Sequence, residues 1–373
     1  MKKTLSLLLA LCLLFSAAAC GPAAQQNTEE TGAIVQTAGA APAESEIPSE
    51  TASEAVTSEA SETAGPQTIS YPLTVTDQAG RQVTIEREPE TLVSGYYIST
   101  SLLIALDLSD RLVGLEAKAD KRPIYALSAP SLLELPNVGS AKEFDLEGCA
   151  ALNPDLAILP LKLQNTAQTL EDLGITVLYV NPENQALLEE MVSLIAAATN
   201  TEARAQELLK FTGDAQTQLA QKLEDAEKPT VYLAGNSSLL STAGDAMYQA
   251  DLIRLAGGTN AAAQISDSYW AEIDYEQLLA WDPAYIILAS DASYTVEDVL
   301  ADENLASCSA VINKQVYQMP ARAEAWDSPV PSGILGAVWL AHILHPEQLS
   351  QQDCESLFDR YYETFYGFTY SES

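Results

Sequence analysis

Basic residues are scarce in this sequence. Its 373 residues include 18 lysines and arginines against 52 aspartates and glutamates, which gives a formal charge of −34. Nucleic acids and anionic lipid surfaces are bound through clustered positive charge, so neither is expected as a partner. Histidine is rarer still, with only His342 and His345 near the end. A zinc or manganese site needs several histidine or carboxylate ligands from different segments, and we therefore expect no metal site.

Cysteines are also few. Of the five, Cys12 and Cys20 lie close to the N-terminus. The other three, Cys149, Cys308 and Cys354, are an odd number and lack the C-x-x-C spacing of metal sites. At most one disulfide can form among them in an oxidising compartment, and the sequence does not assign it.

A catalytic constellation is missing as well. The segment Gly235–Leu239 follows a predicted strand, but it lacks the second glycine that a nucleophile elbow requires after its serine. The two histidines lie too late in the chain and too close together to complete a Ser/His/Asp order. We therefore predict that the protein is not an enzyme and has no cofactor.

What the sequence does contain begins with a targeting segment, residues 1–20. Lys2 and Lys3 supply positive charge, and Leu5–Phe15 is an apolar run too short to span a bilayer. Small residues then lead to Cys20, in a pattern that resembles the lipobox of bacterial lipoproteins. The resemblance implies a cleaved signal peptide, a lipid on Cys20, and an extracytoplasmic protein anchored to the cell membrane through that lipid alone.

Residues 21–70 are rich in alanine, serine, threonine and glutamate. They include eight glutamates, no lysine or arginine, and almost no large apolar side chains. Such a segment cannot bury enough apolar surface to offset the entropy of folding. We predict a disordered acidic tether.

The remaining chain is organised around residues 201–228. Within this range, small and apolar residues recur at steps of three and four, as on one face of a helix. These residues are Ala205, Leu208, Thr212, Ala215, Leu219 and Ala226. Pro229 stops the helix. Because the helix has only one apolar stripe, we predict that it connects two domains rather than lying in the core of one.

Strand and helix patterns alternate on both sides of this connecting helix, in residues 71–200 and 229–373. Such alternation predicts an α/β fold of two lobes with mostly parallel sheets. The stretch Phe144–Pro160 also matches Ile273–Ala289, so one helix–strand unit occurs once in each predicted lobe.

The two copies of this unit share their physical design. Asp145 and Asp274 are predicted N-caps, and Glu147 and Glu276 lie in the first turn, where the helix dipole favours a negative charge. A proline then ends each short helix before an apolar strand. On these grounds alone the two glutamates are helix-start acids.

Several motifs together resemble one family, the helical-backbone (class III) substrate-binding proteins of bacterial ABC importers for ferric siderophores, haem and cobalamin. The motifs are, in order, VTDQAGRQVTI, VGSAKEFDLEGCAALNPDLAIL, LIRLAGGTNAA, IDYEQLLAWDP, AVINKQVYQMP and WLAHILHPEQL. The resemblance implies two Rossmann-like lobes joined by one long helix, with the ligand in the cleft between them. It also implies that Glu147 and Glu276 dock on an ABC permease dimer in the membrane. The expected ligand is an iron chelate or corrinoid, and the protein is expected to act as a monomer.

Ligands of parallel α/β sheets bind beyond the carboxyl ends of the strands. Aromatic faces and a few placed charges hold large planar ligands. The candidate ligand-binding residues that meet these criteria are Tyr96, Tyr97, Lys162, Tyr248, Trp270, Arg322 and Trp326. Lys118, Lys121 and Arg122 also follow a predicted strand.

Two alternatives stay open at this point. One is a ligand sensor that feeds a membrane signalling protein, which the sequence does not separate from a transport receptor. The other is a receptor that binds a metal or an oxyanion in the same cleft.

Overall fold

The computed structural model describes residues 70–165, 168–266 and 270–372. The predicted signal peptide, the predicted lipidation site Cys20 and nearly all of the predicted tether lie outside these residues. Within the described part of the chain, no helix is long and apolar enough to cross a membrane.

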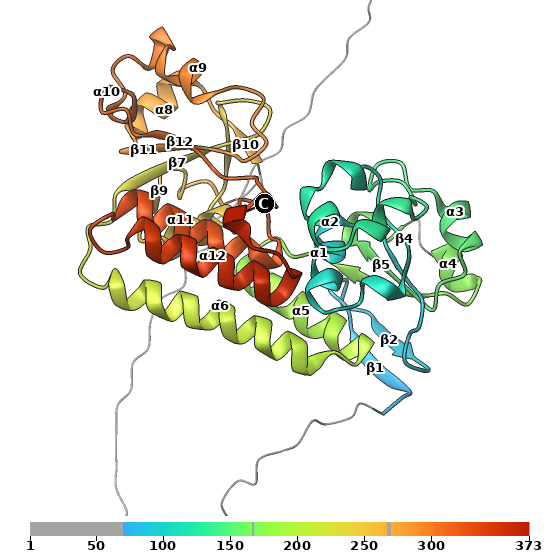
Figure 1. Cartoon of the computed structure of the whole chain (residues 1–373). Coiled ribbons are helices and arrows are strands. Elements are labelled where there is room, and N and C mark those ends of the chain that lie inside the picture. The colour runs from blue at the N-terminus through green and yellow to red at the C-terminus, as the bar shows by residue number, and fades with distance from the viewer. Residues whose placement is uncertain (1–69, 166–167, 267–269, 373) are drawn as a thin grey trace, which may run out of the picture. The chain divides into compact units, whose positions relative to one another are not determined.

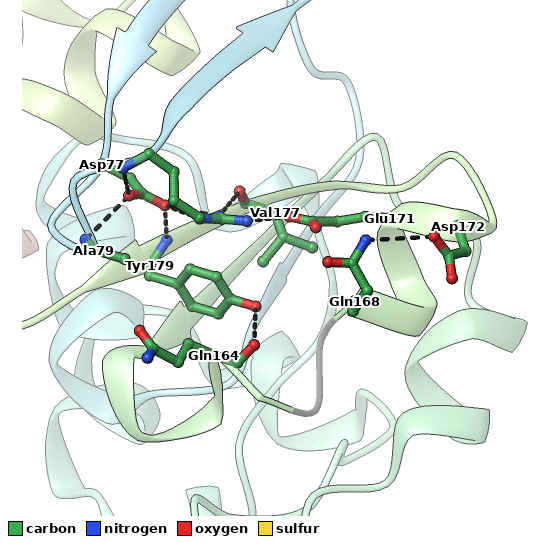
Figure 2. Close-up of polar contacts among 9 residues, drawn as sticks. Asp77, Ala79, Gln164, Gln168, Glu171, Asp172, Val177 and Tyr179 are labelled. Atoms are coloured by element: carbon green, nitrogen blue, oxygen red, sulfur yellow. Dashed lines mark hydrogen bonds and ion pairs between the residues drawn. The ribbon is translucent and has the colours of Figure 1, made fainter.

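The first lobe begins with a β-hairpin. Strand β1 (Leu73–Thr76) pairs antiparallel with β2 (Gln82–Ile85), and Gly80 takes the positive φ of +77° that the connecting turn requires. The side chain of Arg81 connects this hairpin to the rest of the lobe. Its guanidinium pairs with Asp77 at 2.7 Å and with Glu171, and it lies 4.0 Å from the ring centroid of Tyr179 (Figure 2).

A parallel four-stranded sheet forms the centre of the first lobe, with the order β4-β3-β5-β6. Its strands are β3 (Leu92–Ser94), β4 (Leu112–Gly114), β5 (Leu156–Pro160) and β6 (Thr176–Val180). The helices of this lobe are α1 (Tyr97–Ala105), α2 (Pro123–Ser128), α3 (Leu146–Ala151), α4 (Gln168–Asp172) and α5 (Gln185–Thr199).

The second lobe contains a mixed sheet with the order β10-β8-β7-β11-β12, in which β9 also pairs with β7. Its strands are β7 (Thr230–Ala234), β8 (Ser241–Ala243), β9 (Thr259–Asn260), β10 (Trp270–Glu272), β11 (Tyr285–Leu288) and β12 (Val316–Gln318). Strands β7, β11 and β12 run parallel, whereas β8 pairs antiparallel with β7 and β10 pairs antiparallel with β8. The helices are α7 (Tyr248–Leu255), α8 (Tyr275–Trp281), α9 (Val296–Leu300), α10 (Ser309–Ile312), α11 (Ile334–Leu344) and α12 (Gln351–Tyr366).

Helix α6 (Glu202–Lys222) is the predicted connecting helix (Figure 1). Its 21 residues make it about 31 Å long at 1.5 Å per residue. The helix ends at Lys222, so the predicted end at Lys228 is wrong. The next residues include Glu224, Asp225 and Glu227, and negative charges are unfavourable at the carboxyl end of a helix dipole.

Helix α6 contacts both lobes. It packs against α5 of the first lobe and against α7 and α11 of the second. The buried face is the stripe identified in the sequence, and it belongs to a hydrophobic cluster that draws residues from both lobes. Each lobe also has a smaller core of its own beside its sheet. The α/β class, the two lobes and the single connecting helix are therefore confirmed.

Candidate functional site

A small cavity lies between the two lobes, with a volume of about 50 Å³. The first lobe lines it with Tyr97 and Lys121–Tyr125, and the second lobe with Asp291, Ala321, Ala323–Ala325 and Val330. We call this space the interlobe cavity.

The fold explains why these segments meet. Tyr97 follows β3, and Arg122 lies between β4 and α2. On the other lobe, Asp291 follows β11 and Ala321–Ala325 follow β12. All four positions lie beyond the carboxyl ends of parallel strands, which is where open α/β sheets bind their ligands.

Arg122 is the main cation of the interlobe cavity. Its guanidinium lies 4.1 Å from the centroid of the Tyr97 ring, in a cation–π contact. Its Nε atom is buried and has no hydrogen-bond partner among the described residues. An unsatisfied buried donor costs about 1–3 kcal/mol, so this N–H favours an acceptor entering the cavity. The planar fork of arginine suits oxyanions and carboxylates in particular.

Two buried carboxyl groups face Arg122. Glu116, 5% exposed, accepts hydrogen bonds from Thr100 Oγ1 at 2.7 Å and from the Tyr125 hydroxyl at 2.6 Å. Glu324, 8% exposed, accepts hydrogen bonds from Ser101 Oγ and Ser332 Oγ.

Burial is the main influence on the pKa of both carboxyls. It raises the pKa of Glu116, and it raises the pKa of Glu324 to about 7. The hydrogen bonds to each carboxylate and the positive charge of Arg122 oppose this rise. Glu324 is therefore protonated in part of the molecules at neutral pH.

Tyr97 lines the cavity, and Tyr96 packs against it from outside the lining. The rings of Tyr96 and Tyr97 meet edge to face with centroids 5.3 Å apart. Burial raises the pKa of both phenols, so both stay neutral and available as hydrogen-bond donors near pH 7.

The other sequence-predicted ligand residues lie elsewhere. Lys162 is exposed in a short 3-10 turn, Leu161–Leu163, and Trp270 is 42% exposed on β10. Arg322 is exposed, and its guanidinium lies 5.6 Å from the centroid of the Tyr370 ring. None of these three lines the interlobe cavity.

Tyr248 and Trp326, both predicted as ligand-binding residues, lie in the interior. Tyr248 is buried beneath Gly333. Trp326 is only 1% exposed, packs on Phe358 and donates its indole N–H to the Tyr362 hydroxyl at 2.9 Å. Glu324 and Asp327 of the same loop are buried as well, so these two acids face inward with the tryptophan.

Arg122 was noted in the sequence only as one of three basic residues after a strand. The available signal was its place at a carboxyl strand end directly before Pro123, which begins a helix. Glu116 and Glu324 gave no signal, because their burial depends on contacts made by distant segments.

The repeated helix–strand unit is present in both lobes. Asp145 accepts the Gly148 N–H at 2.8 Å and starts α3, which leads to β5. Asp274 accepts the Gln277 N–H at 2.8 Å and starts α8, which leads to β11.

Glu147 and Glu276 lie in the first turns of these helices. Both side chains are exposed, and neither forms an ion pair within the described part of the chain. Both are thus available to an external cation.

No metal centre is found in residues 70–165, 168–266 and 270–372, where no three His, Cys, Asp or Glu side chains are grouped to hold an ion. His342 and His345 instead make hydrogen bonds to the carbonyl oxygens of Leu349 and Gly257, at 2.8 and 3.3 Å. The three cysteines of the folded part are all buried and free.

Comparison with known proteins gives a consistent picture. Residues 92–323 match the family model described as periplasmic binding protein. The molybdate-binding protein MolA of Haemophilus influenzae is 27% identical over 79% of this chain and 91% of its own length. An uncharacterised ABC transporter substrate-binding lipoprotein of Bacillus subtilis, YvrC, is 24% identical over 75% of this chain and 88% of its own. A cobalamin-binding protein of Halobacterium salinarum is 25% identical, with 66% of each chain covered.

Solved structures agree with these relatives. MolA bound to molybdate superposes with a TM-score of 0.71 at 25% identity, covering 80% of this chain and 98% of MolA. A periplasmic solute-binding protein of Veillonella parvula gives a TM-score of 0.68 at 25% identity, covering 80% and 93%. The nickel-bound CeuE protein of Helicobacter pylori has the same fold, with a TM-score of 0.70 at 20% identity and coverage of 80% and 97%.

Proposed function

The chain belongs to the periplasmic binding protein family, and we propose that it captures a compact oxyanion at Arg122 and delivers it to a membrane permease. It is an extracytoplasmic substrate-binding protein of an ABC transporter. Proteins of this family are ligand carriers without catalytic activity, in agreement with the prediction that this chain is not an enzyme. We also propose that the protein acts as a monomer.

The observation that carries the oxyanion proposal is Arg122, which lines the interlobe cavity and whose buried Nε has no hydrogen-bond partner among the described residues. The cavity volume of about 50 Å³ is far below the roughly 300–1,000 Å³ of pockets for drug-sized ligands. A tetrahedral oxyanion is small and accepts hydrogen bonds on every side, as an arginine and a neutral tyrosine require. The similarity to a molybdate-binding protein over most of both chains supports the same ligand class.

A second candidate is the iron chelate or corrinoid predicted from the sequence. The aromatic pair Tyr96 and Tyr97 and the similarity to a cobalamin-binding protein favour it. A ligand of that size requires the lobes to separate, because hydrogen bonds such as the one from the Ile124 N–H to the Ala323 carbonyl at 3.2 Å now close the cavity.

Calorimetric titration of the purified protein with molybdate, tungstate, sulfate, a ferric siderophore and cobalamin tests the ligand class. We expect molybdate or tungstate to bind, and Arg122→Ala to weaken that binding by roughly 10- to 100-fold, because hydrogen bonds to charged groups contribute about 1.5–3 kcal/mol. Arg122→Lys keeps the charge and loses the planar fork, so its affinity is expected to fall in between.

Arg87→Ala is the matched control, since Arg87 is an exposed arginine paired with Asp155 outside the interlobe cavity. It is expected to bind like the unaltered protein. Arg322→Ala compares the two assignments of the ligand-binding arginine, since the structure places Arg122 at the cavity and the sequence predicts Arg322. Tight binding of a chelate or corrinoid, with no response to any oxyanion, would replace the first candidate by the second.

We further propose that the mature protein begins at a lipid-modified Cys20. The similarity to a lipoprotein of Bacillus subtilis supports this anchor. Cys20→Ser is expected to move the protein from the membrane fraction to the soluble extracytoplasmic fraction while ligand binding persists. Unchanged membrane association of this variant would show that another segment holds the protein there.

We propose that Glu147 and Glu276 dock on the permease. Reversing both charges, in the Glu147→Arg, Glu276→Arg double variant, is expected to abolish ligand uptake and to leave ligand affinity unchanged, because both side chains lie outside the interlobe cavity. Paired uptake and binding assays measure the two effects.

The control for the docking variant is Glu297→Arg, Asp353→Arg, which reverses two exposed acids that also lie in helix first turns. It loses the same helix-dipole interaction, about 0.3–1 kcal/mol per site, without touching the proposed docking acids. Loss of uptake in both double variants would argue against specific docking. Full uptake in the docking variant would favour the alternative of a sensor for a signalling protein.

A further inference from the structure

Glu324 is a carboxyl group that bridges the two lobes. Its Oε1 atom accepts a hydrogen bond from Ser101 Oγ on α1 of the first lobe. Its Oε2 atom accepts one from Ser332 Oγ in the second lobe, within the 3-10 turn Pro331–Gly333. The same residue lines the interlobe cavity beside Arg122. Glu324 therefore lies between the lobe contact and the proposed anion site.

Acidic groups outnumber basic groups around Glu324. Arg122 is the cation that acts on the carboxylate, and Lys121 is an exposed cation at the same cavity. The acids nearby are Glu116, which also senses Arg122, and Asp291 and Asp327. The phenols that face Glu324 from α1, α7 and α12 are those of Tyr97, Tyr248, Tyr361, Tyr362 and Tyr366.

A bound anion makes this imbalance worse. It places negative charge in a small cavity that a buried carboxylate already lines, and it engages the guanidinium that now stabilises this carboxylate. Like charges at such short range in a poorly solvated site repel strongly. Protonating the carboxyl removes the repulsion without breaking the bridge, because a neutral carboxyl still hydrogen-bonds both serines with one hydroxyl reversed.

We propose that the anion enters the interlobe cavity together with a proton taken up from solvent by Glu324. This inference rests on the proposed oxyanion function and deepens it. The proton adds to one carboxylate oxygen and no other bond changes, so the protein binds the anion and the proton as a pair.

The direction of the pH dependence follows from linkage. Burial raises the pKa of Glu324 to about 7 in the unliganded protein, and the anion raises it further. Between these two pKa values, the liganded form holds one more proton than the free form, so affinity rises as the pH falls. Below about pH 7 both forms become protonated and the affinity levels off.

The test is calorimetric titration with molybdate in two buffers of different ionisation enthalpy, neither of them an oxyanion. At about pH 8 the wild-type protein is expected to take up close to one proton per anion, and its affinity is expected to fall by up to about tenfold per pH unit above neutrality. Glu324→Gln, which is permanently neutral, is expected to take up almost none and to lose this pH dependence.

Glu116→Gln is the matched control. Glu116 is also a buried carboxyl with two hydrogen bonds, but both partners lie in the first lobe and it does not line the cavity. This variant is expected to keep most of the proton uptake. If Glu324→Gln fails to fold by circular dichroism, Ser332→Ala replaces it. Losing that hydrogen bond raises the pKa of Glu324, so the pH window of the affinity change is expected to move upward.

The outcomes are distinct. Molybdate binding without proton uptake overturns the inference and leaves the proposed function standing. Proton uptake that disappears in Glu116→Gln and persists in Glu324→Gln overturns the inference and assigns the proton to Glu116. If Ser332→Ala does not move the pH window of the affinity change, the inference is overturned as well. Failure of molybdate to bind at all removes the proposed oxyanion function and this inference with it.

Discussion

The packing of α6 against both lobes is the constraint on which the rest of the structure depends. One face of this helix is buried by α5 on one side and by α7 and α11 on the other, within a single hydrophobic cluster. Separating the lobes completely would expose that cluster to water, at a cost of about 25 cal/mol for each Å² of apolar surface. The helix therefore holds the carboxyl strand ends of both sheets near each other, where Tyr97 and Arg122 meet Ala323 and Glu324.

The interface that α6 maintains differs in chemistry from the lobe cores. The cores beside the two sheets are hydrophobic, whereas the cavity is lined by Arg122 and the buried carboxyl of Glu324, and a second buried carboxyl, Glu116, lies outside its lining and acts on the same arginine. Buried charges lower stability unless they are paired, and Arg122 leaves a nitrogen unsatisfied. Buried charges that lower stability at a cleft, rather than in a core, are typical of a binding site. The acids also explain how an anionic ligand could be released, since an ionised Glu324 repels it.

The sequence predicts those features that local pattern controls. The stripe on α6 follows from residue spacing, and the duplicated unit follows from its N-caps Asp145 and Asp274. The end of α6 was misplaced because acids after Lys222 oppose the helix dipole more than the apolar spacing favours continuation.

The site was harder to predict because it depends on contacts between lobes. Trp326 lies among polar residues in the sequence, yet the loop turns inward there and buries it together with Glu324 and Asp327. Arg322 is predicted as a ligand-binding residue, but it lies exposed over Tyr370, and Arg122 of the first lobe lines the cavity instead. The position of Arg122 directly before the helix start at Pro123 is a local signal, but it does not show which loops the lobe contact brings together.

The most direct test of the account is a crystal structure of the protein grown with molybdate, using the anomalous scattering of molybdenum to locate the ion. The account predicts one strong anomalous peak in the interlobe cavity, within hydrogen-bond distance of Arg122 and next to Tyr97. A peak in the groove that Lys222 and Arg360 line beside α6, with the interlobe cavity empty, would contradict it.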